Sequence, residues 1–375
     1  MTARPAPAAA PVSLAADMDR LPQYELDLDG AQRTRVDALL ADGPVISLHD
    51  HPVRLPDPLD AATLRQHEAS GRDHLGRDGL VGSELTAVFA SAVSRADLGD
   101  LLRWFAFLRA DIAHAGGLFV AEDAAAVAAR DGRVGVVFAM EDLGCVGEDL
   151  AGIEVLYGIG VRCAGLAYNA GSALGGGLGQ PNDPGLSDHG RSAVALMNAL
   201  GMLVDLAHVG DETSLQAARA SRKPVVISHA GARGLWQTVR MKPDDVLRAC
   251  ADTGGVIGIE AAPGSTRVPG STGHDLDGVM AHVEYCAELL GVDHVALGPD
   301  TFFGDHVGFY AAAGANPVPP PPGEAAPQMA YVAGMENPGE AHRNAASWLV
   351  SHAWSDDECA KLLGGNVARV VAQAI

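Results

Sequence analysis

The 375-residue chain has few cysteines and few basic residues. Its five cysteines are odd in number and widely scattered, without the paired spacing of a disulfide framework or a zinc ribbon. We therefore expect reduced thiols and a cytoplasmic protein. Lys and Arg number 26 against 47 Asp and Glu, which gives a net charge of −21. Such an acidic chain argues against nucleic acid and anionic membranes as partners.

A long apolar run is missing as well. Residues 1–16 are rich in Ala and Pro and lack the apolar core of a signal peptide or a membrane span. We expect residues 1–20 to form an arm that is flexible or clings to the surface, followed by a single domain over residues 21–375. Hydrophobic residues make up 48% of the chain, so this domain can bury a large core.

The chain does contain short apolar runs that alternate with amphipathic, helix-compatible segments. The runs are residues 44–46, 84–90, 133–141, 163–166, 202–207, 224–228, 255–260 and 294–298. The helical segments are residues 31–40, 101–115, 152–157, 191–200, 211–221, 243–253 and 278–290. Eight β-α units predict an α/β protein built as a (β/α)8 TIM-type barrel, whose site lies at the carboxyl ends of the strands. A doubly wound open sheet is the structural alternative.

Three further segments interrupt or follow this pattern. Residues 171–185 are Gly-rich, but no Lys follows the glycines as in a phosphate loop, so we expect a flexible active-site loop. Residues 311–339 are rich in Ala, Pro and Gly and follow the last strand, where they could form a lid. Residues 341–375 predict two or three short C-terminal helices on the flank of the barrel.

Polar residues recur where the apolar runs end. His49 and His51 follow the first run at alternate positions, so strand geometry points both imidazoles the same way, as a metal-chelating pair requires. The full set of such residues is His49, His51, Glu141, Tyr168, His208, His229 and Asp300. Taken singly, each has an ordinary structural explanation, such as a core histidine or a helix cap. Their shared placement at strand ends favours one common site.

Four histidines and two carboxylates at one end of a barrel form the ligand set of a binuclear metal centre. A carboxylate such as Glu141 can bridge two divalent ions about 3.5–4 Å apart, and the water between the ions then becomes a nucleophile near neutral pH. Asp300 could take the proton of that water and pass it to a leaving amine. We expect two zinc ions, with manganese or iron as the alternatives.

Five motifs resemble those of a known family, the membrane (renal) dipeptidases. These are the M19 metallopeptidases of the amidohydrolase superfamily. Residues 202–208 (MLVDLAH) and 224–233 (PVVISHAGAR) are similar to the family's G-M-L-V-D-L-S-H and P-V-I-x-S-H-S-x-A-R. Residues 239–245 (VRMKPDD) resemble P-R-N-x-x-D-D, residues 295–300 (VALGPD) resemble G-x-G-S-D, and residues 364–370 (GGNVARV) resemble G-x-N-x-x-R-V. The resemblance runs from about Pro44 to the C-terminus.

The resemblance implies a role for each residue of the site. His49 and His51 would hold the first metal, Glu141 would bridge, His208 and His229 would hold the second metal, and Asp300 would be the catalytic acid/base. Arg240 lies where the family has an arginine that grips the free carboxylate of the substrate, a task that suits the guanidinium fork. Family members are often dimers, so a homodimer is expected on the same grounds.

Three departures from the family pattern mark a divergent subgroup. His49-Asp50-His51 is H-x-H where the family usually has H-x-D, which removes one negative charge from the centre. Tyr168 stands where the family has a substrate-polarising histidine, although a phenol can also donate to a developing oxyanion. Residues 298–306 differ from the family's G-S-D-x-D-G, so the pocket wall changes too.

The leading hypothesis is a hydrolase that cleaves dipeptides or similar small amides bearing a carboxylate, with a metal-bound hydroxide as nucleophile and with Asp300 and Tyr168 as catalytic residues. Arg240 and Tyr168 would bind the substrate. The first alternative is a specialised amidohydrolase, deacylase or metal-dependent lyase acting on a secondary metabolite. The second is a metal-stabilised binding protein without turnover.

Overall fold

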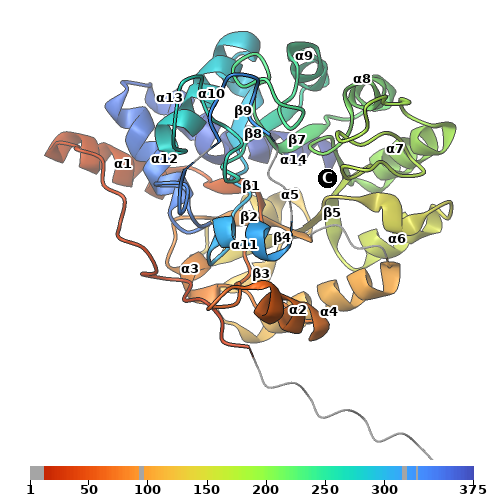
Figure 1. Cartoon of the computed structure of the whole chain (residues 1–375), viewed down its shortest axis with the longest axis horizontal. Helices are drawn as coiled ribbons and strands as arrows, with labels where there is room; N and C mark the ends of the chain where they lie inside the picture. The colour runs from red at the N-terminus through yellow and green to blue at the C-terminus, as the bar shows by residue number, and fades with distance from the viewer. Residues whose placement is uncertain (1–11, 93–96, 315–318, 327) are drawn as a thin grey trace, which may run out of the picture.

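A computed structural model describes residues 12–92, 97–314, 319–326 and 328–375. At its centre eight parallel strands pair in the order β1-β2-β4-β5-β6-β7-β8-β9 (Figure 1). These strands are β1 (Ile46–Asp50), β2 (Ala87–Ala92), β4 (Val134–Met140), β5 (Val161–Gly165), β6 (Leu203–Asp205), β7 (Val226–Ala230), β8 (Val256–Ile259) and β9 (Val295–Leu297). All eight predicted strands are therefore present.

The two ends of this sheet meet just beyond β9. The backbone N–H of Asp300 donates to the carbonyl oxygen of His49 at 3.0 Å, and the N–H of His51 donates to that of Thr301 at 2.9 Å. These bonds place the chain after β9 beside β1, so the barrel is nearly closed. The predicted (β/α)8 barrel is confirmed, and the open-sheet alternative is wrong.

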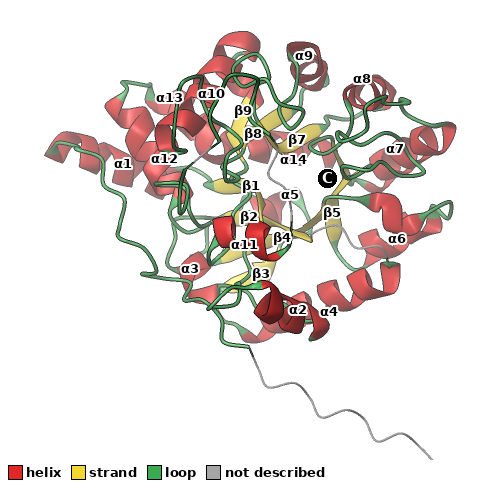
Figure 2. Cartoon of the chain, in the orientation of Figure 1, coloured by secondary structure: helices red, strands yellow, loops and turns green. Residues whose placement is uncertain are grey.

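Helices surround the strands (Figure 2). The seven predicted helical segments correspond to α1 (Gly30–Asp42), α4 (Leu98–His114), α6 (Ala151–Gly158), α7 (Asp188–Leu200), α8 (Asp211–Ala220), α9 (Asp244–Asp252) and α10 (Leu276–Leu290). The elements that the sequence reading missed are short: α2 (Ala61–Ala69), α3 (Arg77–Val81), β3 (Leu118–Val120), α5 (Ala124–Val127) and α11 (His306–Ala312). β3 pairs with β4, outside the barrel path.

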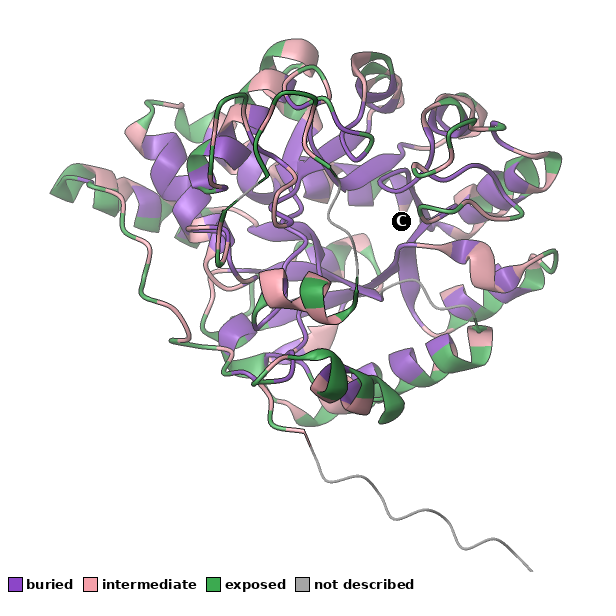
Figure 3. Ribbon diagram, viewed as in Figure 1, coloured by how far each residue is buried: buried purple, intermediate pink, exposed green. Residues whose placement is uncertain are grey.

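The barrel strands are buried on both faces (Figure 3), which explains why they read as continuous apolar runs. Inward-facing residues such as Ile46, Phe89 and Val137 form one cluster with Val367 and Val370 of α14 (Asn366–Ala374). The C-terminal helix thus fills the interior at the amino ends of the strands. The carboxyl ends remain for a site.

The C-terminal segment differs in part from the expected flanking helices. α12 (Ala341–Ser351) does lie on the flank, against α1, and is followed by α13 (Asp356–Ala360) and a π-helical turn (Lys361–Gly365). α14 instead packs beneath the barrel. Asn366 holds it there by donating to the carbonyl oxygens of Val292 and Val295 at 2.7 and 2.8 Å.

The expected arm and lid are described only in part. Residues 1–11 of the arm lie outside the described residues, but Ala15 is buried and its N–H donates to the Leu55 carbonyl at 2.8 Å. Residues 315–318 and 327 of the expected lid also lie outside them. Further along that segment, the N–H of Gln328 donates to Thr272 and the carbonyl of Ala333 accepts from Leu276. This part packs on the loop after β8, and a lid role stays a prediction.

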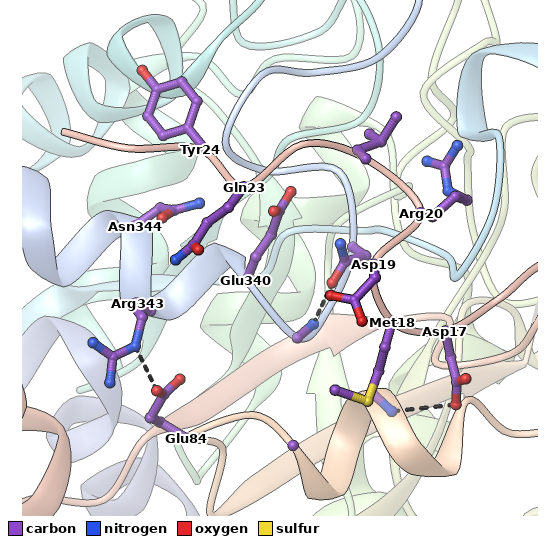
Figure 4. A pocket seen from close by; sticks show the side chains of 15 residues that line it. Asp17, Met18, Asp19, Arg20, Gln23, Tyr24, Glu84, Glu340, Arg343 and Asn344 are labelled. Carbon is purple, nitrogen blue, oxygen red and sulfur yellow. Dashed lines mark hydrogen bonds and ion pairs between the residues drawn. The ribbon is translucent and has the colours of Figure 1, made fainter.

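A groove of about 330 Å³ lies between the segment Asp17–Tyr24, the loop at Glu84 and α12 (Figure 4). Its charges are largely paired within the protein; Arg343, for example, donates to Glu84 at 2.5 Å. It shares no residue with the strand-end cluster. Among the described residues, no helix combines the length and apolar character that crossing a membrane requires.

Candidate metal centre

The five predicted metal ligands and the predicted acid/base Asp300 come together at the carboxyl ends of five strands of the barrel. His49 belongs to β1 and His51 follows it, Glu141 follows β4, His208 follows β6, His229 lies in β7 and Asp300 follows β9. All six are buried, none more than 7% exposed. Parallel strands bring even His49 and Asp300, 251 positions apart, to one edge, which is why strand-end placement in the sequence predicts proximity.

One group of ligand atoms surrounds the first histidine pair. Nε2 of His49 lies 3.4 Å from Oε1 of Glu141 and 3.6 Å from Oδ1 of Asp300, and Nε2 of His51 lies 3.2 Å from each of these oxygens. Ligands about 2.0–2.1 Å from a tetrahedral zinc ion lie about 3.3 Å apart. The spacing therefore fits a common metal ion, and it adds Asp300 to the residues in ligand range.

A second group shares Glu141 with the first. Glu141, His208 and His229 offer ligand atoms within 4.8 Å of one another. The Nε2 atoms of His208 and His229 are 3.0 Å apart, and Oε1 of Glu141 lies 4.0 Å from Nε2 of His229. Glu141 thus stands between both histidine pairs, where a bridging carboxylate would stand.

Contacts behind the imidazoles fix which nitrogen faces the cluster. Nδ1 of His51 donates to the carbonyl oxygen of Ser91 at 2.8 Å, and Nδ1 of His208 donates to Oδ1 of Asn169 at 2.8 Å. With Nδ1 protonated, each Nε2 presents a lone pair, as metal ligation requires. Nε2 of His49 and Oε2 of Glu141 are buried without a hydrogen-bond partner. These orphaned atoms and the all-acceptor set fit a cation.

The two histidine pairs differ in electrostatics. Burial lowers the pKa of His49 and His51, but the adjacent carboxylates of Asp300 and Glu141 outweigh it and raise both pKa values, that of His51 well above its ordinary range. Burial lowers the pKa of His208 to about 3 and holds that of His229 well below its ordinary value. The carboxylate side of the cluster therefore attracts positive charge, while the other pair is neutral, the form that binds metals.

Tyr168 and Arg240 flank this cluster. The ring of Tyr168 stacks on His208 with centroids 4.2 Å apart, and the charge of Glu141, followed by burial, raises the pKa of its hydroxyl, which is therefore a donor at neutral pH. Arg240 is buried, donates to the carbonyl oxygen of His229 at 2.9 Å and forms an ion pair with Glu260.

Glu260 is a site residue that the sequence reading missed. It follows β8, is fully buried and lies with His229 and Asp300 in a third group of close ligand atoms. Burial raises its pKa to about 7 against the opposing charge of Arg240. The sequence did contain a pattern that could have predicted Glu260, because Glu260 ends the apolar run 255–260 just as Glu141 ends the run 133–141.

Helix α11 brings aromatic residues against the first histidine pair. His51 stacks on Phe302 with ring centroids 4.6 Å apart, and Phe302 contacts His306 and Phe309 of α11, each at 5.0 Å. A cavity of about 230 Å³ opens behind His51. Most of its wall is apolar, contributed by Val53, Leu55, Leu64, Trp104, Phe302 and Phe309, with His67, Glu68, Asp73 and Ser91 at its polar parts.

The architecture defines a class: a parallel β/α barrel with a buried metal-ligand cluster at the carboxyl ends of its strands. Within that class, the family model of the membrane dipeptidases (peptidase family M19) matches residues 33–308. The chain belongs to this family, as its motifs predicted.

Solved structures support the same fold. An amidohydrolase from Pseudomonas aeruginosa aligns with a TM-score of 0.74 and 23% identity over 90% of this chain and 98% of that one. A metallopeptidase from Rhodobacter sphaeroides, liganded with a phosphinate mimic of the dipeptide L-Ala-D-Ala, aligns with a TM-score of 0.69 and 21% identity over 89% of this chain and 100% of that one. At these identities the likeness establishes the fold.

Curated relatives match over a shorter stretch. An uncharacterized dipeptidase of Schizosaccharomyces pombe is 34% identical over 187 residues, 48% of this chain and 44% of that protein. Dipeptidase aclJ of Aspergillus oryzae is 31% identical over 171 residues, 45% of this chain and 40% of that protein. The matches thus span less than half the length of either relative.

Proposed function

We propose that the protein is a binuclear metal-dependent hydrolase that cleaves the amide bond of dipeptides or similar small amides. The observation that carries this proposal is the placement of Glu141, which is shared between two buried groups of ligand atoms. His49, His51 and Asp300 would complete one metal site, and His208 and His229 the other. Family membership supports the reaction class.

The ions, when bound, supply Lewis-acid activation of water and of the amide carbonyl. The carboxylate of Asp300 takes the proton of the attacking water and returns it to the nitrogen of the leaving amine. The hydroxyl of Tyr168 donates to the carbonyl oxygen as negative charge develops there. Because the cluster is buried, solvent screens these charges less than it would at the surface, and the electrostatic interactions are correspondingly stronger.

The surroundings of the cluster support a small substrate with an apolar side chain. The apolar cavity behind His51 and Phe302 has a volume of about 230 Å³, enough for one such side chain. Arg240 is the candidate for binding a carboxylate. Small or D-configured C-terminal residues are plausible substrates, since the relative from Rhodobacter sphaeroides was crystallised with a mimic of L-Ala-D-Ala.

One observation favours the second candidate, an amidohydrolase specialised for another amide. The ion pair with Glu260 already neutralises the guanidinium of Arg240, so a free substrate carboxylate meets less positive charge than an unpaired arginine would offer. His51 and Tyr168, the departures from the family motifs, contact the same cluster: His51 lies beside Glu141 and Asp300, and Tyr168 stacks on His208. A substrate that is neutral at this end, such as an amide or ester of a dipeptide, fits this arrangement.

Amine release from a panel of L,L- and L,D-dipeptides by the zinc-loaded protein tests the proposal. We expect hydrolysis, and a loss of at least about 100-fold in kcat for Asp300→Asn, the range that general acid–base groups supply. Activity is expressed per bound metal, because Asp300 also lies in ligand range. Asp252→Asn, an exposed change at the end of α9, is the matched control and keeps full activity.

If the protein with two bound metals hydrolyses no dipeptide of the panel, the dipeptidase proposal is overturned and the second candidate is favoured. The same panel with capped C-termini then identifies the amide that the pocket accepts. Zinc as the native metal, a cytoplasmic location and a homodimer stay predictions.

A further inference from the structure

A carboxylate and a hydroxyl lie behind the cluster, in the motifs MLVDLAH and PVVISHAGAR. Oδ1 of Asp205 accepts from the backbone N–H groups of Ala207 and Ser228 at 3.0 and 2.8 Å. Its Oδ2 accepts from the hydroxyl of Ser228 at 2.5 Å. Asp205 and Ser228 are 3% and 1% exposed, so water does not compete for these bonds.

The same hydroxyl contacts one histidine from each ligand group. Oγ of Ser228 lies 2.7 Å from Nδ1 of His229 and 3.3 Å from Nδ1 of His49. A hydroxyl has a single proton and two lone pairs, and a carboxylate only accepts. Since the proton of Ser228 is committed to Asp205, its lone pairs accept from Nδ1–H of both imidazoles. Each Nε2 then presents its lone pair to the cluster.

We propose that Asp205 and Ser228 are positioning residues that set the metal-binding tautomer of His49 and His229 together, through one hydroxyl. Asp205 also lies within 4.8 Å of ligand atoms of His49 and His229, but both of its oxygens already accept hydrogen bonds, so we assign neither Asp205 nor Ser228 as a metal ligand. They differ from Ser91 and Asn169, which each orient one histidine, because Ser228 links the two groups of ligand atoms. The inference rests on the proposed metal centre.

The direction of these hydrogen bonds gives an unusual prediction for Asp205→Asn. The side-chain oxygen of Asn stays with the two backbone N–H groups that Oδ1 holds now, so its NH2 group faces Oγ of Ser228. The hydroxyl proton must then turn to Nδ1 of His49 or His229. That histidine is forced to carry its proton on Nε2, where a metal would bind. Asp205→Asn is nearly isosteric, yet it favours the tautomer whose Nε2 cannot bind a metal.

Removing the Ser228 hydroxyl as well removes the proton donor that favours the unsuitable tautomer. In Ser228→Ala the imidazoles lose an acceptor but are free to adopt the metal-binding tautomer. We expect a loss in zinc affinity of about 10-fold for Ser228→Ala and about 100-fold for Asp205→Asn, the range known for partners behind metal ligands. The double variant Asp205→Asn/Ser228→Ala binds zinc more tightly than Asp205→Asn alone, a non-additivity that a double-mutant cycle measures.

The experiment is zinc affinity by competition with a chromophoric chelator, with circular dichroism of each variant as the check on folding. Asp50→Asn is the matched control, because Asp50 is also buried, at the end of β1, and accepts from a serine hydroxyl, Ser47, at 2.5 Å and from the N–H of Thr301. Among the described residues, the hydroxyl of Ser47 makes no hydrogen bond to an imidazole; it donates to Asp50. This control keeps its zinc affinity.

A double variant that binds zinc more weakly than Asp205→Asn would overturn the inference, as would an unchanged affinity in Asp205→Asn. If Asp205→Asn does not fold, Ser228→Ala is compared with Ser47→Ala; equal affinities in these two variants overturn it, and a selective loss in Ser228→Ala supports it. Failure of the proposed metal centre is a separate result, in which the unaltered protein binds no zinc.

Discussion

Position 51 carries an imidazole where the family motif usually has an aspartate, and the surrounding structure is built for it. Nδ1 of His51 donates to Ser91, its ring stacks on Phe302, and its Nε2 faces Glu141 and Asp300. An aspartate could not make the stacking contact or reach the Ser91 carbonyl as a donor. The site thus combines four imidazoles with two carboxylates in its two principal ligand groups, one negative charge fewer than the motif's aspartate would give.

The pairing of Arg240 with Glu260 predicts a change in substrate selectivity. Glu260→Gln removes the negative charge and frees the guanidinium for a substrate carboxylate, an interaction worth about 1.5–3 kcal/mol for a charged hydrogen bond. We expect the ratio of kcat/KM for L-Ala-D-Ala over its C-terminal amide to rise at least about 10-fold. Glu336→Gln is the control, because Glu336 is also buried and paired with an arginine, Arg20, and its pKa is likewise raised to about 7. An unchanged ratio in Glu260→Gln would contradict this role.

Lys242 predicts a dependence of stability on pH. It is fully buried, donates from Nζ to the carbonyl oxygen of Val209 at 2.5 Å, and burial lowers its pKa to about 7 from 10.5. The unfolded chain therefore binds more protons between these values, so the free energy of unfolding rises with pH. From pH 7 to pH 9 this group contributes a rise of about 2 kcal/mol.

Denaturant unfolding of the protein and of Lys242→Met at pH 7 and pH 9 measures this contribution. The methionine variant lacks the titrating amine, so its unfolding free energy should rise less over this interval, by about the same 2 kcal/mol. Parallel pH profiles for the two proteins would show that Lys242 is not neutralised by burial.

At the scale of elements, glycines let three strands converge on the site. A Cβ at Gly258 of β8 would lie 2.1 Å from the carbonyl oxygen of Ser228 in β7, and one at Gly298 after β9 would lie 2.0 Å from the same oxygen. Both clashes involve backbone, which cannot swing aside. The small residue after β9 is therefore needed to bring His49, Ser228 and Asp300 together.

Gly298→Ala should accordingly move the end of β7 and weaken the cluster. We expect an unfolding free energy lower by about 1–3 kcal/mol, the usual cost of overpacking, together with weaker zinc binding. Gly273→Ala is the matched control, since a Cβ there meets nothing within 4 Å. Denaturant melts and zinc titration of both variants compare them, and equal stability of the two would contradict the close approach.

The sequence predicted long elements well and short ones poorly. Strands such as β4 are buried on both faces, so their apolar runs stand out, and α4 carries its buried residues at helical spacing. β3, α5 and α11 have three to seven residues each, too few to show a period. α11 matters most among them, because its position against Phe302 follows from tertiary packing alone.

At the scale of the whole molecule, the barrel explains which site residues could be predicted from the sequence and which contacts could not. Strand-end residues converge by topology, so the six cluster residues could be found from spacing. The pairing of Arg240 with Glu260 and the link from Asp205 through Ser228 to two histidines depend on side-chain positions across neighbouring strands. The spacing of these residues in the sequence therefore does not predict their contacts.

The structural role of the C-terminal motif GGNVARV is also visible only in the complete fold. A Cβ at Gly364 would lie 2.3 Å from the carbonyl oxygen of Pro44, just before β1. Asn366 and Arg369 donate to backbone carbonyls around the starts of β8 and β9. The motif therefore closes the amino end of the barrel and takes no part in the chemistry at the other end.

The central claim is that one shared carboxylate joins two metal sites, and an anomalous-difference map of zinc-loaded crystals tests it most directly. We predict two peaks on either side of Glu141, one bounded by His49 and His51 and the other by His208 and His229. A single peak, or two peaks that do not share Glu141, would contradict the account.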